Sequence, residues 1–128
     1  MIELPPYAHF LGITAARDGD GALVFAMPFG DAVLGRPGYL HGGAIAGLLE
    51  IAAFGAVRDA LGPDSGATIK PINVTTSFMR GGTAHETFAG ATVTRLGARV
   101  ANVEAHAWQQ DRAKPIASAQ MNMLIRRG

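Results

Sequence analysis

The segment from Gly42 to Leu61 constrains the fold of this chain more than any other feature. It contains no proline, is rich in Ala and Leu, and is followed by Gly62 and Pro63, a pair typical of the end of a helix. Apolar or small residues occupy nearly every side of the predicted helix, which should therefore be buried. The rest of the chain has to wrap around it.

Glu50 is the only charged residue from Gly42 to Val57. At about 100° per residue it shares a helix face with Ala46 and Gly47, whose small size should leave a hollow large enough for a ligand or another backbone. A carboxylate beside a hollow is typical of a functional site. The alternative is that the glycines only allow close packing and that Glu50 is a core acid with satisfied hydrogen bonds.

Composition limits the classes of protein to consider. With 128 residues, 48% of them hydrophobic and 16% charged, we expect one domain over residues 1–128 with a modest core, which can also bury surface by oligomerising. The net charge of +1 gives no electrostatic case for a nucleic acid or an anionic membrane as partner. The absence of cysteine excludes a disulfide scaffold, thiolate zinc sites and cysteine nucleophiles.

Targeting and metal signals are also missing from the sequence. The first six residues lack the basic and apolar regions of a signal peptide, and the stretch from Ala44 to Val57 is too short and too interrupted to span a bilayer, so we expect a cytoplasmic protein. His9, His85 and His106 do not have the spacing of metal ligands, and no metal is expected.

Outside the helix, the hydrophobic period is twofold and predicts antiparallel strands. Residues 10–17 and 22–28 flank a hairpin signal at 18–21, and three further strands are expected at about 86–95, 99–109 and 114–125. Between them, residues 72–78 alternate, which predicts a strand with one buried and one polar face. Small or apolar residues face one side of the last two strands, namely Ala101, Val103, Ala105, Ala107, Ala117, Ala119, Met121, Met123 and Ile125. The prediction is an α+β fold in which an antiparallel β-sheet wraps around one long central helix.

Three short motifs resemble those of a known family. They are His41-Gly42-Gly43 followed by the acid Glu50, Phe78-Met79-Arg80 after the next strand, and Arg95-Leu96-Gly97-Ala98-Arg99 between later strands. Together with the order of elements, they resemble the hotdog-fold acyl-CoA thioesterases, specifically the PaaI and 4-hydroxybenzoyl-CoA thioesterase group, over about residues 10–125.

The resemblance implies hydrolysis of an acyl-CoA thioester without a metal, a cofactor or a Ser or Cys nucleophile, since coenzyme A is part of the substrate. It implies that the backbone N–H of Gly42 polarises the thioester carbonyl and that Glu50 acts either as nucleophile or as general base on water. For His41 it implies a hydrogen bond that orients the turn, with a proton-transfer role as the alternative.

The resemblance also implies a homodimer, which can assemble further into a homotetramer, with two sheets joined edge to edge. The acid of one subunit then faces the loop and strand of the other. The substrate-binding residues implied in this way are Gly43, Asn73, Thr75 and Ser77 around the pocket, and Arg80, Arg95, Gly97 and Arg99 toward the nucleotide phosphates.

One position departs from the family pattern. Relatives commonly carry Asn or Gln six residues before the His, where this chain has Gly35. That role is either vacant or reassigned to a polar residue among Asn73, Thr75, Thr76 and Ser77. Two other functions stay open: a hotdog domain that binds acyl-CoA without turnover, and a hotdog dehydratase or hydratase.

Overall fold

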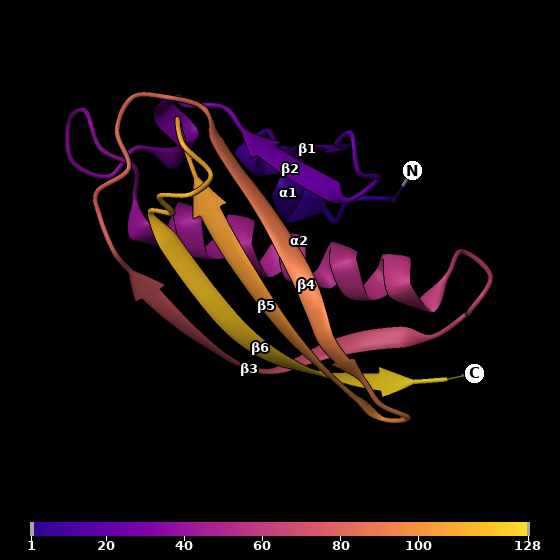
Figure 1. Cartoon of the computed structure of the whole chain (residues 1–128). Helices are drawn as coiled ribbons and strands as arrows, with labels where there is room; N and C mark the ends of the chain where they lie inside the picture. The colour runs from indigo at the N-terminus through magenta and orange to yellow at the C-terminus, as the bar shows by residue number, and fades with distance from the viewer. Residues whose placement is uncertain (1, 128) are drawn as a thin grey trace.

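The computed structural model describes residues 2–127. Along the chain it contains α1 (Pro6–Leu11), β1 (Thr14–Arg17), β2 (Leu23–Met27), the short 3₁₀ helix η1 (Asp31–Val33), α2 (Gly42–Leu61), β3 (Thr68–Phe78), β4 (Thr87–Leu96), β5 (Val100–Trp108) and β6 (Ala117–Arg126). Its six strands form one antiparallel sheet in the order β1-β2-β4-β5-β6-β3, which curves around α2 (Figure 1). The predicted α+β arrangement is confirmed.

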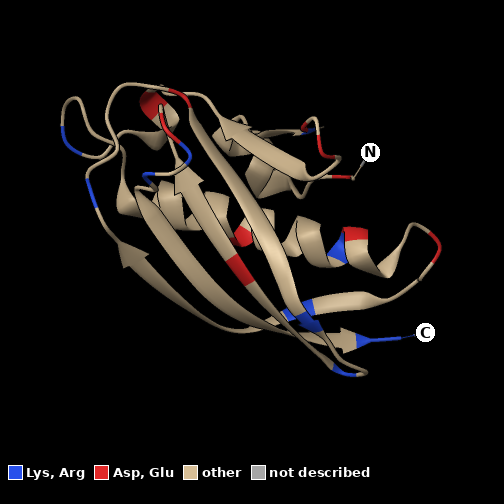
Figure 2. Ribbon diagram, in the orientation of Figure 1, with Lys and Arg blue, Asp and Glu red and all other residues tan. Residues whose placement is uncertain are grey.

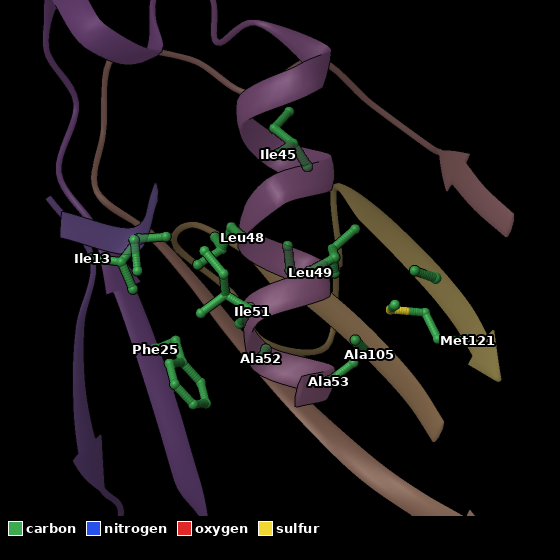
Figure 3. Close-up of a cluster of buried hydrophobic side chains, with 14 of the residues drawn as sticks. Ile13, Phe25, Ile45, Leu48, Leu49, Ile51, Ala52, Ala53, Ala105 and Met121 are labelled. Carbon is green, nitrogen blue, oxygen red and sulfur yellow. The ribbon is translucent and has the colours of Figure 1, made fainter. Parts of the chain in front are cut away.

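The core lies between α2 and the inner face of the sheet. Leu48, Leu49 and Ala52 are fully buried on the helix, and Met121 and Ala105 meet them from the strands (Figure 3). All nine residues expected on the inner faces of β5 and β6 are buried. Among the described residues, no helix combines the length and apolarity needed to cross a membrane.

Gly55 sets how closely α2 approaches the sheet. A Cβ atom built at this position would collide with the ring of Phe25, which is fully buried on β2. The helix can lie against β2 only because Gly55 has no side chain, although glycine is a poor residue for a helix interior.

The first predicted strand is wrong in its first part. Phe10 and Leu11 belong to α1, and only Thr14–Arg17 form β1. Pro6 begins α1 with a fixed φ suited to the first turn of a helix, and Gly12 ends it in the left-handed conformation, with φ 75°. The hairpin after β1 is confirmed, and the Asp18 carboxylate accepts the N–H groups of Asp20 and Ala22 within it.

The prediction of a buried face for the strand at residues 72–78 is also wrong for the chain by itself. Strand β3 ends the sheet beyond β6, and its apolar residues Ile72, Val74 and Phe78 are 53%, 39% and 56% exposed. A bulge at Pro71–Asn73 shifts its register against β6. An exposed apolar face beside an unpaired strand edge is a surface that another chain can cover.

We expect Gly55→Ala to destabilise the protein although alanine favours helices. Overpacking against Phe25 should cost about 1–3 kcal/mol in the free energy of unfolding, more than the gain of about 1 kcal/mol from helix propensity. Urea denaturation checks this. Adding Phe25→Leu to Gly55→Ala should recover part of the loss, and an unchanged or raised midpoint for Gly55→Ala alone would contradict the packing argument.

Candidate active site

The start of α2 leaves one backbone donor without an acceptor. His41 is the N-cap: its carbonyl oxygen accepts the N–H groups of Ala44 and Ile45, and its Nδ1 accepts the N–H of Gly43 at 2.8 Å. The N–H of Gly42 has no acceptor among residues 2–127. It lies at the positive end of the helix dipole, where backbone N–H groups bind an anion or a polarised carbonyl oxygen.

The cap also defines the state of the His41 side chain. While Nδ1 accepts the hydrogen bond from Gly43, it has no proton of its own. A Cβ atom at Gly43 would lie 2.9 Å from this Nδ1, so the glycine allows the imidazole to fold over the turn. His41 and Gly43 thus hold the geometry of the turn that presents the Gly42 N–H.

A cavity of about 500 Å³ opens beside this donor. It is lined by residues from the loop before α2, from α2 itself and from the segment after β3: Gly35, Arg36, Tyr39, Leu40, His41, Gly42, Ile45, Phe78, Met79, Arg80, Gly81 and Gly82. The lining contains two guanidinium groups, of Arg36 and Arg80, and no carboxylate. Together with the helix dipole they favour an anionic ligand.

Arg36 was not among the residues predicted from the sequence. It lies in the loop between η1 and α2, and its guanidinium stacks on the ring of Tyr39 at 4.2 Å. Only a lone cation in a glycine- and proline-rich loop hinted at it.

Glu50 is half-buried and lies outside this cavity. Figure 2 shows a single acidic position in the middle of an otherwise uncharged stretch of α2. Among the described residues, its carboxylate has no hydrogen bond and no ion pair. Its position is about 12 Å along the helix axis from Gly42, and a Glu side chain spans only roughly 5 Å.

This separation limits the chemistry of a single chain. The N–H of Gly42 points beyond the N-terminus of α2, away from Glu50. The carbonyl oxygen of one ligand therefore cannot contact both groups of the same chain.

The hollow expected beside Glu50 is occupied, and that prediction is wrong. A Cβ atom at Gly47 would lie 2.9 Å from Cε2 of Tyr7 and 3.4 Å from a methyl group of Leu11. Gly47 therefore provides room for α1 to pack on α2.

The structure leaves no room for a larger side chain at Gly35. A Cβ atom there would lie 3.0 Å from Cα and 3.1 Å from N of His41. The N–H of Gly35 donates to the Tyr39 carbonyl oxygen at 2.9 Å, which closes the loop tightly before α2. An amide side chain at this position would displace the backbone of the helix cap.

The predicted polar residues of β3 face away from the helix. Asn73, Thr75 and Ser77 pair with outward-facing residues of β6, and Asn73 accepts a hydrogen bond from Asn122 at 2.9 Å. Thr76 pairs with the buried Ala119 and faces the helix side of the sheet. Of the four polar candidates, only Thr76 lies on the same side of the sheet as α2.

The three predicted arginines do not come together in one chain. Arg80 lines the cavity, whereas Arg95 and Arg99 lie at the β4–β5 turn, near the C-terminus and at the other end of α2 (Figures 1 and 2). In that turn the N–H of Gly97 donates to the Val100 carbonyl oxygen at 2.9 Å. Gly97 has a structural role there, since a Cβ would lie 2.8 Å from the same oxygen.

No metal centre is evident in the part of the chain that the structure describes, where no three His, Asp or Glu side chains are grouped to hold an ion. On the outer face of the sheet, burial and, to a smaller extent, the charge of Arg112 lower the pKa of His106.

The sequence model of the thioesterase superfamily matches residues 37–116, a range that includes the helix cap, Glu50 and all of the cavity lining except Gly35 and Arg36. The chain belongs to this superfamily. A candidate esterase of Halobacterium salinarum is 30% identical over 98 residues, which make up 74% of this chain and 64% of that protein. The chain thus aligns with less than two thirds of that relative's length.

Solved structures of other proteins have the same fold. A Bacillus halodurans protein crystallised with CoA has a TM-score of 0.85 and 22% identity, over 97% of this chain and 80% of that one. A candidate thioesterase of Ralstonia eutropha, related to phenylacetic acid degradation, has a TM-score of 0.77 and 26% identity, over 96% and 92% of the two chains. The fold is therefore the hotdog fold.

We expect Gly35→Ala to destabilise the protein by about 1–3 kcal/mol, because the added Cβ has to push the backbone of His41. Gly30→Ala is the matched control: it lies in the same stretch before α2, and its Cβ would meet no atom within 4 Å. Thermal or urea denaturation of both variants checks the expectation. Equal stability of the two variants would contradict it.

Proposed function

We propose that the protein hydrolyses acyl-CoA thioesters, and that each active site combines the Gly42 N–H of one chain with Glu50 of a second copy. The unpaired Gly42 N–H beside the positively charged cavity is the observation that carries the proposal. Membership of the thioesterase superfamily supports it, and so does the fold shared with a protein crystallised with CoA.

The need for a second chain follows from the distance between the two groups. Gly42 and Glu50 are about 12 Å apart along one helix, so they act on one carbonyl only if they come from different chains. Strand β3 offers the surface for assembly, with a free edge next to the exposed Ile72, Val74 and Phe78. Pairing β3 of two copies would continue the sheet and bring both helices onto the same side.

In the proposed mechanism, the thioester oxygen accepts a hydrogen bond from the Gly42 N–H. The negative charge that develops on this oxygen is stabilised by the positive end of α2. Glu50 either attacks the carbonyl carbon to form an anhydride that water then hydrolyses, or removes a proton from the attacking water. In both cases the carbon–sulfur bond breaks and CoA leaves as a thiolate. Its proton comes from water: through Glu50 when Glu50 acts as general base, and from solvent when the anhydride forms.

The remaining residues bind the substrate or position the catalytic groups. His41 and Gly43 hold the turn, and Arg80 with Arg36 binds phosphate groups of CoA at the cavity. Arg95 and Arg99 could reach the same nucleotide only from another chain. Thr76 replaces Asn73, Thr75 and Ser77 as the polar residue of β3 that we place near the site, because it faces the helix side.

We expect Glu50→Gln to lower kcat by about 10²-fold or more without changing the affinity for an acyl-CoA analogue, because the amide can neither attack nor accept the proton of water. Release of free thiol from a panel of acyl-CoA esters measures kcat. Glu104→Gln is the matched control, since Glu104 is an exposed carboxylate on the outer face of the sheet.

Three results would contradict the proposal. One is the parental rate in a folded Glu50→Gln protein. Another is tight binding of acyl-CoA by the parent with no release of thiol, which would indicate a binding domain. The third is addition of water to an enoyl-CoA, which would indicate a hydratase.

A further inference from the structure

The aromatic side chain of Tyr7 lies over α2 one turn before Glu50. Its ring and hydroxyl oxygen are 2.9 Å and 3.6 Å from the place of a Cβ atom on Gly47. Gly47 is the position three residues before Glu50, and such positions are neighbours on a helix surface, about 5–6 Å apart. Tyr7 therefore occupies the space that the sequence alone left open beside the acid.

The direction of helical side chains brings Glu50 toward the same space. Side chains on an α-helix point back toward its N-terminus and lie over the residues three and four positions earlier. For Glu50 these are Gly47 and Ala46, so we expect its carboxylate to extend toward the phenol ring that covers Gly47.

The Tyr7 hydroxyl is available for a further hydrogen bond. It has no hydrogen-bond partner in residues 2–127. The residue is exposed, at 51%, and its ring stacks on Phe10 with centroids 6.2 Å apart.

We propose that Tyr7 is a positioning residue for Glu50: its O–H donates to the carboxylate through one water molecule and orients it toward the thioester held by the partner's Gly42. This inference rests on the proposed thioesterase function. Each site would then take Tyr7 and Glu50 from one chain, and the Gly42 N–H with its cavity from the other.

The test is Tyr7→Phe, which keeps the ring over Gly47 and removes only the hydroxyl. We expect kcat for acyl-CoA hydrolysis to fall about tenfold, with KM and the melting temperature unchanged, because the group acts on the reacting carboxylate and not on substrate binding or packing. Phe10→Leu is the control: it removes the stacking partner but no hydroxyl, and should keep kcat within about twofold.

A second variant reaches the same hydroxyl from the helix. Gly47→Ala places a Cβ against the Tyr7 ring and should displace it, so we expect a similar loss of kcat. In the Tyr7→Phe background, Gly47→Ala should add little, because the hydroxyl that it would displace is already gone.

Several outcomes would overturn the proposal. A parental kcat in Tyr7→Phe would show that the hydroxyl has no role, and a change confined to KM would show a role in binding instead. An equal loss in Phe10→Leu would assign the effect to aromatic packing. Failure of this inference is distinct from failure of the proposed function: a parent that hydrolyses no acyl-CoA overturns both, whereas an active parent with an inactive Glu50→Gln and an active Tyr7→Phe overturns only the role of Tyr7.

Discussion

The burial of α2 against the inner face of the sheet is the constraint on which the rest of the structure depends. Its sheet-facing side chains form the core, and Gly55 and Gly47 allow β2 and α1 to approach it closely. With the helix fixed in this way, it begins directly after the loop that the Gly35–Tyr39 hydrogen bond closes. The cap then uses the N–H groups of Gly43, Ala44 and Ile45 and leaves only that of Gly42 for a ligand.

The same helix also forces the candidate site to extend beyond one chain. A rigid helix keeps the positions of Gly42 and Glu50 about 12 Å apart along its axis, and a Glu side chain of roughly 5 Å does not close that gap. The exposed apolar face of β3 agrees with this requirement. It includes Phe78, which also lines the cavity, and a second chain could cover this side chain. The distance within the helix and the unpaired strand thus favour the same assembly.

The sequence predicted those features that depend on local periodicity. The limits of α2, the hairpin at Asp18 and the inner faces of β5 and β6 follow from apolar spacing and from turn residues, and the structure confirms them. Features that depend on contacts between distant segments could not be predicted. Tyr7 fills the space at Gly47, and His41 crowds Gly35, and neither contact leaves a pattern in the sequence. The prediction of a buried face for β3 was wrong for the single chain. The alternation of apolar and polar residues does not reveal whether the same chain or another one covers the apolar face.

The most direct test of a site shared between two chains is subunit complementation. Glu50→Gln removes the acid, and Gly42→Pro removes the backbone donor; proline fits there, since His41 has the extended conformation, with φ −69° and ψ 134°, that precedes proline. Each variant alone should be nearly inactive. After unfolding and refolding as a mixture, half of the dimers should be mixed, and each mixed dimer has one intact site, so about a quarter of the parental activity should return. If donor and acid belonged to the same chain, the mixture would stay as inactive as its components, and the account would be contradicted.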